Sequence, residues 1–209
     1  MKTDYTHVCV VLDASGSMCS IKDDAVGALT AFCDDQRKKA AEGEKISIDL
    51  YQFNYDVKRL AHNASIDELQ RYVDAYSCSG STALYDAVCQ GIDELGAFFK
   101  RLDESERPES VLFVVVTDGE ENSSRFFTSD DVRERVERQR SKYNWVFTYL
   151  VNGVDVEEAR KNFGATEDEM GEFDRDSMKE HVSQRLCCEM SRVRLNRIAS
   201  RKPRSKSAD

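Results

Sequence analysis

The sequence predicts an α/β fold: a three-layer α/β/α arrangement, doubly wound around a mainly parallel sheet with one short antiparallel edge strand. Apolar runs typical of strands alternate with long helical patterns, and two of those runs are continuous, as in strands covered on both faces. With 209 residues and 40% hydrophobic content, the chain can build one substantial core. We therefore expect one domain over residues 1–198 and a basic, disordered tail over residues 199–209.

The first half of the chain alternates between period-two and helical spacing of its apolar residues. The predicted elements are a strand over 7–13, a helix over 17–41, a strand over 45–53, a hairpin return over 56–61 and a short helix over 66–76. Gly43 would stop the first helix, and Ser65 would cap the short one.

The second half continues the alternation and contains the most hydrophobic strand. The predicted elements are a helix over 82–102, a strand beginning at 110, a helix over 129–142, a strand over 145–151, a short helix over 156–163 and a final helix over 176–198. Gly164 would end the short helix, and Asp176 would cap the final one. The segment 164–176 predicts only a weak last strand, which leaves the final edge of the sheet open.

Composition limits the classes of function. A net charge of -9 disfavours nucleic-acid binding by the body of the protein, because phosphate contacts need clustered cations. From Arg192 onward, however, seven basic residues accompany one acid, so the tail could contact nucleic acid or an acidic partner, or could be a solvated helix end. No apolar run approaches the roughly 20 residues of a membrane span, and no signal peptide is recognisable. We expect a cytoplasmic protein without membrane contact.

The cysteine pattern is also consistent with a cytoplasmic protein. There are seven, without C-x-x-C spacing, which predicts reduced thiols rather than a disulfide framework. Cys19 and Cys78 fall near the binding edge predicted below, either as a redox pair or as two unrelated thiols.

Three segments place oxygen donors at one predicted edge of the sheet. "DASGS" closes the first strand, "GSTALYDA" opens the middle helix, and "TDGEE" closes the central strand. Their candidate metal ligands are two carboxylates and three hydroxyls, namely Asp13, Asp118, Ser15, Ser17 and Thr82. In doubly wound sheets, ligands bind beyond the carboxyl ends of the strands. Hard oxygen donors suit Mg²⁺ or Mn²⁺ in preference to zinc or copper.

These five residues resemble the motif of the von Willebrand factor A-type domain, D-x-S-x-S followed by a distant Thr and a distant Asp, which forms a metal-ion-dependent adhesion site. The resemblance covers most of the chain from about Tyr5. It implies that Ser15, Ser17 and Thr82 bind the metal directly, and that Asp13 and Asp118 bind it directly or through water. It also implies adjacent first and central strands, and it points to the small stand-alone proteins of bacteria and their phages.

The expected function is therefore a binding module that is not an enzyme. A divalent cation, Mg²⁺ or Mn²⁺ in preference to Ca²⁺, would capture a carboxylate of a partner protein. Glu120 and Glu121 could lie close to the site or simply begin a solvated loop. Capping acids at two strand ends are the plainer interpretation of Asp13 and Asp118, but three accompanying hydroxyls favour a metal.

Two other classes stay open. A Mg²⁺-dependent phosphoryl-transfer enzyme could use Asp13 as its nucleophile, although residue 15 is Ser where a second carboxylate would be expected and no phosphate-binding G-x-x-x-x-G-K-[ST] motif is present. The three histidines, His7, His62 and His181, also lie outside the predicted site loops. Alternatively, the chain could be an assembly or virion-associated factor in which the metal only stabilises the fold.

Overall fold

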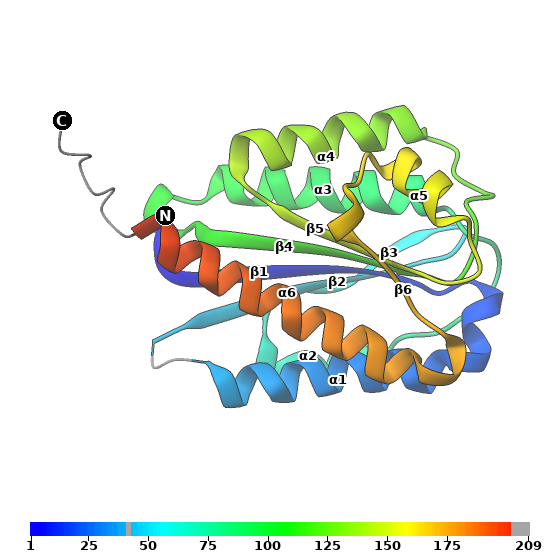
Figure 1. Cartoon of the computed structure of the whole chain (residues 1–209), viewed down its shortest axis with the longest axis horizontal. Helices are drawn as coiled ribbons and strands as arrows, with labels where there is room; N and C mark the ends of the chain where they lie inside the picture. Colours follow the sequence, from blue (N-terminus) through cyan, green and yellow to red (C-terminus); the bar gives the residue numbers. More distant parts are fainter. Residues whose placement is uncertain (41–42, 202–209) are drawn as a thin grey trace.

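The computed structural model describes residues 1–40 and 43–201, and it confirms the α/β prediction (Figure 1). Within these ranges six strands form one sheet in the order β3-β2-β1-β4-β5-β6. The strands are β1 (Lys2–Asp13), β2 (Lys45–Phe53), β3 (Val57–Ser65), β4 (Pro108–Thr117), β5 (Val146–Val151) and β6 (Met170–Glu172). The helices are α1 (Lys22–Lys39), α2 (Leu69–Val73), α3 (Leu84–Arg101), α4 (Ser129–Tyr143), α5 (Val156–Phe163) and α6 (Met178–Arg201).

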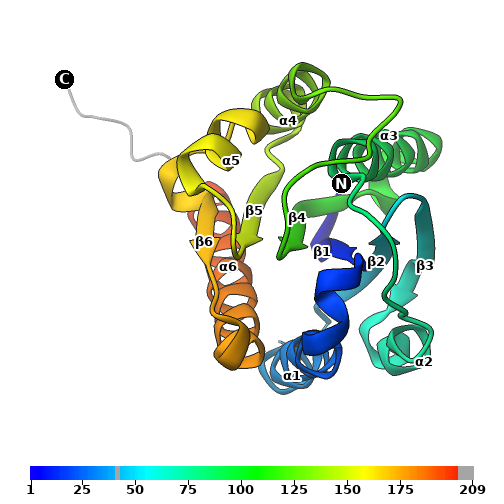
Figure 2. The ribbon, with the colours of Figure 1, turned by 90° about the vertical axis from the view of Figure 1, so that its right-hand side faces the viewer.

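The helices cover both faces of the sheet, as Figures 1 and 2 show. On β1, Val8, Val10 and Leu12 share a hydrophobic cluster with α1, α2 and α6. The alternate residues Cys9 and Val11 share the other cluster with α3, α4 and α5. Because successive side chains of a strand point to opposite faces, a strand covered on both faces must be apolar at every position. This is why β1 is an unbroken apolar run from Val8 to Leu12. None of the helices in the described parts of the chain is long and apolar enough to cross a membrane.

Strand pairing also follows the prediction. β1 runs parallel to β2 and β4, and β5 runs parallel to β4. The edge strand β3 is antiparallel to β2, as the hairpin predicted. The edge that the sequence left open is closed by the short β6, which pairs in parallel with β5.

The order of the strands reverses between β1 and β4. The chain leaves β1 through α1 towards β2, and it leaves β4 through α4 towards β5 on the other side. The two connections diverge, so the carboxyl ends of β1 and β4 lie next to each other without a crossing segment between them (Figure 2). The candidate residues of the first and central strands meet here.

The structure differs from the prediction mainly at helix ends. The predicted helix over 17–41 begins as a 3₁₀ turn, Gly16–Ile21, and α1 itself ends at Lys39. The prediction that Asp176 caps the last helix is wrong, because this residue lies inside a 3₁₀ turn, Arg175–Ser177, that precedes α6. α6 runs to Arg201, three residues into the predicted tail. The rest of that tail, 202–209, lies outside the described residues.

Candidate metal centre

Asp13, the last residue of β1, ties together the ends of the two central strands. Its side chain is fully buried. One carboxylate oxygen accepts the Ser15 backbone N–H at 2.7 Å, and the other accepts the Thr117 hydroxyl of β4 at 2.6 Å. The carboxylate therefore fixes the turn that carries the two serines relative to β4.

The two serines of this turn connect Asp13 to Asp118. The Ser15 and Ser17 hydroxyls lie 3.0 Å apart, and Ser17 donates to Asp118 Oδ1 at 2.6 Å. Gly16 between them donates its N–H to the Gly80 carbonyl at 2.9 Å, which joins the turn to the loop before α3. Side chains from two strands and one turn thus form one hydrogen-bonded group.

Thr82 approaches the same place from the start of α3. Its N–H donates to Asn122 Oδ1 at 2.9 Å, so the loop after β4 holds it in position. A side chain added at Gly119 would begin 3.7 Å from the Thr82 hydroxyl and 3.8 Å from the Ser17 hydroxyl. The two hydroxyls therefore converge over Gly119. All five sequence-predicted residues lie at this one edge of the sheet.

Arg175 is a member of this group that the sequence analysis missed. From the 3₁₀ turn before α6, its guanidinium forms an ion pair with Asp118 Oδ2. The same group donates to the Ser17 carbonyl and to the Ser20 hydroxyl, both at 3.3 Å. No local pattern could have indicated this contact, because 57 residues separate Arg175 from Asp118.

The electrostatics of this edge favour a cation. Burial raises the pKa of Asp13, and the nearby charge of Asp118 raises it further, while hydrogen bonds from Thr117 and Ser15 oppose the shift. Two neighbouring carboxylates repel each other unless a positive charge lies close to them. Arg175 supplies part of that charge from within the chain.

Two carboxylates hold the loop after β4 in place, one from the loop itself and one from α3. One is Glu121, for which the sequence left open a solvated position; its carboxylate instead bonds to this loop. The other is the buried Asp86 of α3, which the sequence analysis did not predict as a functional residue. Each carboxylate accepts backbone N–H groups at 2.7–3.1 Å, from Tyr85, Ser123 and Ser124 for Glu121, and from Arg125, Phe126 and Phe127 for Asp86. Such contacts organise the loop before any ligand arrives.

Cys19, in the 3₁₀ turn Gly16–Ile21, and Cys78, in the loop before α3, lie close enough to interact, and both are free thiols. Burial raises the pKa of the Cys78 thiol, and the neighbouring Cys19 adds to the shift, although a hydrogen bond with Tyr76 opposes it.

The donor set suits a hard cation. In residues 1–40 and 43–201, no group of three or more His, Cys, Asp or Glu side chains could hold a metal ion. At the carboxyl edge, by contrast, hydroxyl oxygens from Ser17 and Thr82 converge near the Asp118 carboxylate. Hydroxyl and carboxylate oxygens are the ligands that Mg²⁺ and Mn²⁺ prefer, so the residues fit such an ion.

Comparison with known proteins agrees with this geometry. The chain matches the family model of the von Willebrand factor type A domain over residues 7–184, and it belongs to this family. Domains of this family are metal-dependent adhesion and protein-interaction modules that bind a divalent metal at the metal-ion-dependent adhesion site. No curated protein matches the chain.

Solved structures share the fold at low sequence identity. The type A domain of the pilus tip protein Mfa5 from Porphyromonas gingivalis is 10% identical, with a TM-score of 0.67, and 90% of this chain and 96% of that chain are covered. Proximal thread matrix protein 1 from the mussel byssus is 14% identical, with a TM-score of 0.62. The match covers 87% of this chain but only 45% of the mussel protein. A further structure of the mussel protein, 15% identical with a TM-score of 0.59 over 87% of this chain and 46% of that chain, has a zinc-occupied adhesion site.

Proposed function

We propose that Asp13, Ser15, Ser17, Thr82 and Asp118 hold a divalent cation, Mg²⁺ or Mn²⁺ in preference to Ca²⁺, and that the protein uses this cation to capture a carboxylate of a partner protein. The observation that carries the proposal is the convergence of the Ser17 and Thr82 hydroxyls over Gly119, next to the Asp118 carboxylate. A site built from hydroxyls and few carboxylates leaves the bound ion much of its positive charge.

Each residue has a separate task in this proposal. Ser15, Ser17 and Thr82 present hydroxyl oxygens to the ion, and Asp118 supplies charge. Asp13 holds the serine turn through its bond to the Ser15 N–H, and it meets the ion directly or through water. When bound, the cation supplies a positive coordination position for an oxygen of the partner's carboxylate. The fixed loop after β4 keeps these groups in place, which lowers the cost of ordering them on binding.

The enzyme alternative has less support. An aspartyl nucleophile must present an oxygen to its substrate. Asp13 is fully buried, and both of its carboxylate oxygens already accept hydrogen bonds from within the chain. We therefore favour a binding module over a phosphoryl-transfer enzyme.

Calorimetric titration of Mg²⁺ and Mn²⁺ into metal-stripped protein tests the site. Wild type should bind one ion, and Ser17→Ala and Thr82→Ala should each bind at least about tenfold more weakly. Ser191→Ala, a change at an exposed hydroxyl on α6, is the matched control and should bind like wild type. Equal affinity of all four proteins would overturn the assignment. Circular dichroism of each variant separates lost binding from lost folding.

A metal that only stabilises the fold makes a different prediction. In that case Mg²⁺ would raise the melting temperature, but metal-loaded protein would bind no carboxylate. The peptide experiment below distinguishes the two possibilities, because it compares an aspartate peptide with its asparagine counterpart.

A further inference from the structure

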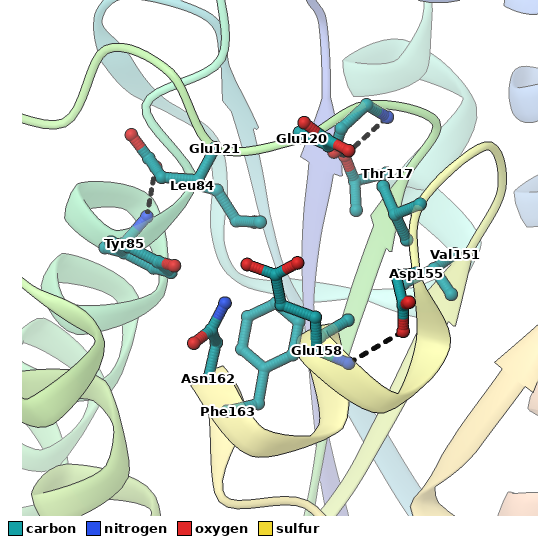
Figure 3. Close-up of a pocket in the computed structure, with 13 residues that line it drawn as sticks. Leu84, Tyr85, Thr117, Glu120, Glu121, Val151, Asp155, Glu158, Asn162 and Phe163 are labelled. Atoms are coloured by element: carbon teal, nitrogen blue, oxygen red, sulfur yellow. Dashed lines mark hydrogen bonds between the residues drawn. The ribbon is translucent and has the colours of Figure 1, made fainter.

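A cavity of about 110 Å³ lies directly beside the candidate metal centre (Figure 3). The start of α3, the loop after β4 and the helix α5 surround it. Thr117 and Gly119 belong to its wall, and these residues also contact or adjoin the metal-centre group. A ligand at the metal centre would therefore have this cavity within reach.

The floor of the cavity is apolar and firmly packed. Leu84, Val151 and Phe163 line it, and all three side chains are buried. Phe163 stacks on Tyr149 with ring centroids 4.4 Å apart, which anchors α5 against the sheet. Such a floor can accept a hydrocarbon stem without rearrangement.

The rim of the cavity is acidic. Asp155 and Glu121 already accept backbone N–H groups, from Glu158 at 3.0 Å and from Ser124 at 2.7 Å respectively. The other two rim carboxylates belong to Glu120 and Glu158. Within the described part of the chain, no hydrogen bond or ion pair engages either of them. Figure 3 shows the Glu158 carboxylate pointing from α5 into the cavity, towards Leu84.

We propose that this cavity binds a basic side chain, Arg or Lys, of the same partner whose carboxylate meets the metal. The inference rests on the proposed function and specifies the partner further. The stem of such a side chain would lie on the Leu84 and Phe163 floor, and its charged head would meet Glu158 and Glu120. Long basic side chains bury their stems in this way while their charged ends face a polar rim.

Charge complementarity selects this occupant over others. A phosphate or a second carboxylate would meet two unneutralised acids, and a purely apolar side chain would supply no counter-charge to the exposed carboxylates of Glu120 and Glu158. An aliphatic stem that ends in a positive charge satisfies both the floor and the rim.

The position of Gly119 sets the spacing on the partner. This residue lines the cavity and also lies under the Ser17 and Thr82 hydroxyls, without a side chain to separate the two sites. An extended chain advances about 3.3 Å per residue, so neighbouring sites call for an acidic and a basic residue within about three positions of each other. The partner is thus a segment that carries a closely spaced acid and base.

Four synthetic peptides test this inference. Acetylated Gly-Asp-Gly-Arg-Gly amide is compared with versions in which Asn replaces Asp, citrulline replaces Arg, or both changes are made; further sets vary the spacing between the two residues. Citrulline keeps the shape of arginine without its charge. Chemical-shift titrations of full-length ¹⁵N-labelled protein, in Mg²⁺ and in EDTA, give the affinities.

In Mg²⁺ the Asp–Arg peptide should bind about fivefold more tightly than the Asp–citrulline peptide, as expected for a partly exposed ion pair. Glu158→Gln should abolish this preference for Arg and keep the preference for Asp over Asn. Glu157→Gln is the matched control, because this neighbouring side chain pairs with Arg160 on the exposed face of α5.

The outcomes separate the two proposals. If aspartate peptides outbind asparagine peptides in Mg²⁺ but arginine and citrulline bind alike at every spacing, the cavity inference is overturned and the proposed function stands. If aspartate and asparagine peptides bind alike, the proposed function itself fails. Absence of binding by all peptides at millimolar concentration would overturn both.

Discussion

The two halves of β1 carry polar clusters built from similar residue types, yet the clusters are organised in opposite ways. At the carboxyl end, Asp13 and the serine turn meet Asp118 at the edge of the sheet. In the amino-terminal half of β1, His7 lies between Ser47 and Asp49 of β2, and we call these three residues the amino-end cluster. The second set contains the residue types of a hydrolytic triad, which makes the comparison informative.

The amino-end cluster is closed. His7 Nδ1 lies 2.8 Å from the Ser47 hydroxyl, and His7 Nε2 lies 3.4 Å from Asp49 Oδ1. Asp49 also accepts the Asn63 N–H at 2.6 Å and lies 3.0 Å from His62 Nδ1. His7 and Asp49 are fully buried, and Ser47 is 2% exposed. A substrate has no route to such a serine.

The contrast teaches that access, and not residue type, separates a binding site from a structural network. Buried polar groups that satisfy one another hold strands together. The carboxyl end has the same kind of hydrogen bonding among its members, but it lies at the strand-order reversal, next to a cavity and a loop fixed in advance. The variants below should therefore change stability at one end and ligand binding at the other.

The largest effect on stability is expected from Asp49→Ala. The change removes a buried acceptor and leaves the Asn63 N–H and His7 without it, at a cost of about 3 kcal/mol in the free energy of unfolding. Urea titration measures this, with the exposed Asp103→Ala as control. The folded fraction should still bind Mg²⁺ like wild type; a lost metal site would show that the two ends of β1 are coupled.

Asp118→Ala should have the converse effect. Mg²⁺ affinity should fall at least about 100-fold, since even partners outside the coordination sphere are worth 10–100-fold. Stability should change little, because the lost ion pair joins Asp118 to the half-exposed Arg175. Calorimetry measures the Mg²⁺ affinity and urea titration measures the stability of the same samples. A loss of stability as large as that of Asp49→Ala would contradict the distinction between a binding end and a structural end of β1.

Acid should destabilise the amino end selectively. Burial lowers the pKa of His7, although Asp49 opposes the shift. Below the ordinary pKa of about 6.5, the unfolded chain therefore binds a proton that the folded chain does not, and stability falls as the pH falls. The melting temperature of metal-free protein should drop between about pH 7.5 and pH 5.5, and His7→Gln should remove that drop. His181→Ala, at an exposed histidine, should retain it.

Asp13 provides an internal check on the sign. Its raised pKa means that the folded chain holds a proton more readily than the unfolded chain does, so its contribution to stability grows as the pH falls. A wild-type protein that gains stability over the tested range would show that the carboxyl end, and not His7, controls the response.

The smallest expected effect belongs to Arg175→Gln. Arg175 occupies Asp118 Oδ2, so removing its charge should free that oxygen and raise Mg²⁺ affinity about threefold. Arg160→Gln, which breaks an exposed pair on α5, is the control. A weaker affinity in Arg175→Gln would mean that this residue orients Asp118 for the metal instead of competing with it.

Much of the fold could be predicted because burial leaves a local pattern. β1 contains an unbroken apolar run from Val8 to Leu12, and β4 contains one from Val111 to Val116. The alternation in β2 and the helical spacing in α3 are also visible along the chain. Ser65 and Gly164 were recognisable as a helix start and a helix end, since capping is a property of neighbouring residues. The Asp176 cap failed because a 3₁₀ turn, Arg175–Ser177, runs through this residue before α6 begins.

The sequence by itself determined the alternation of strands and helices, because hydrophobic period is a property of neighbouring residues. The order and spacing of the motif residues predicted the five oxygen donors. Only the tertiary structure decided that Arg175 pairs with Asp118, that Glu121 and Asp86 hold the loop after β4, and that Glu158 faces a cavity beside Gly119. These contacts join segments tens of residues apart. Their geometry depends on how the helices pack on the sheet, and no local pattern encodes it.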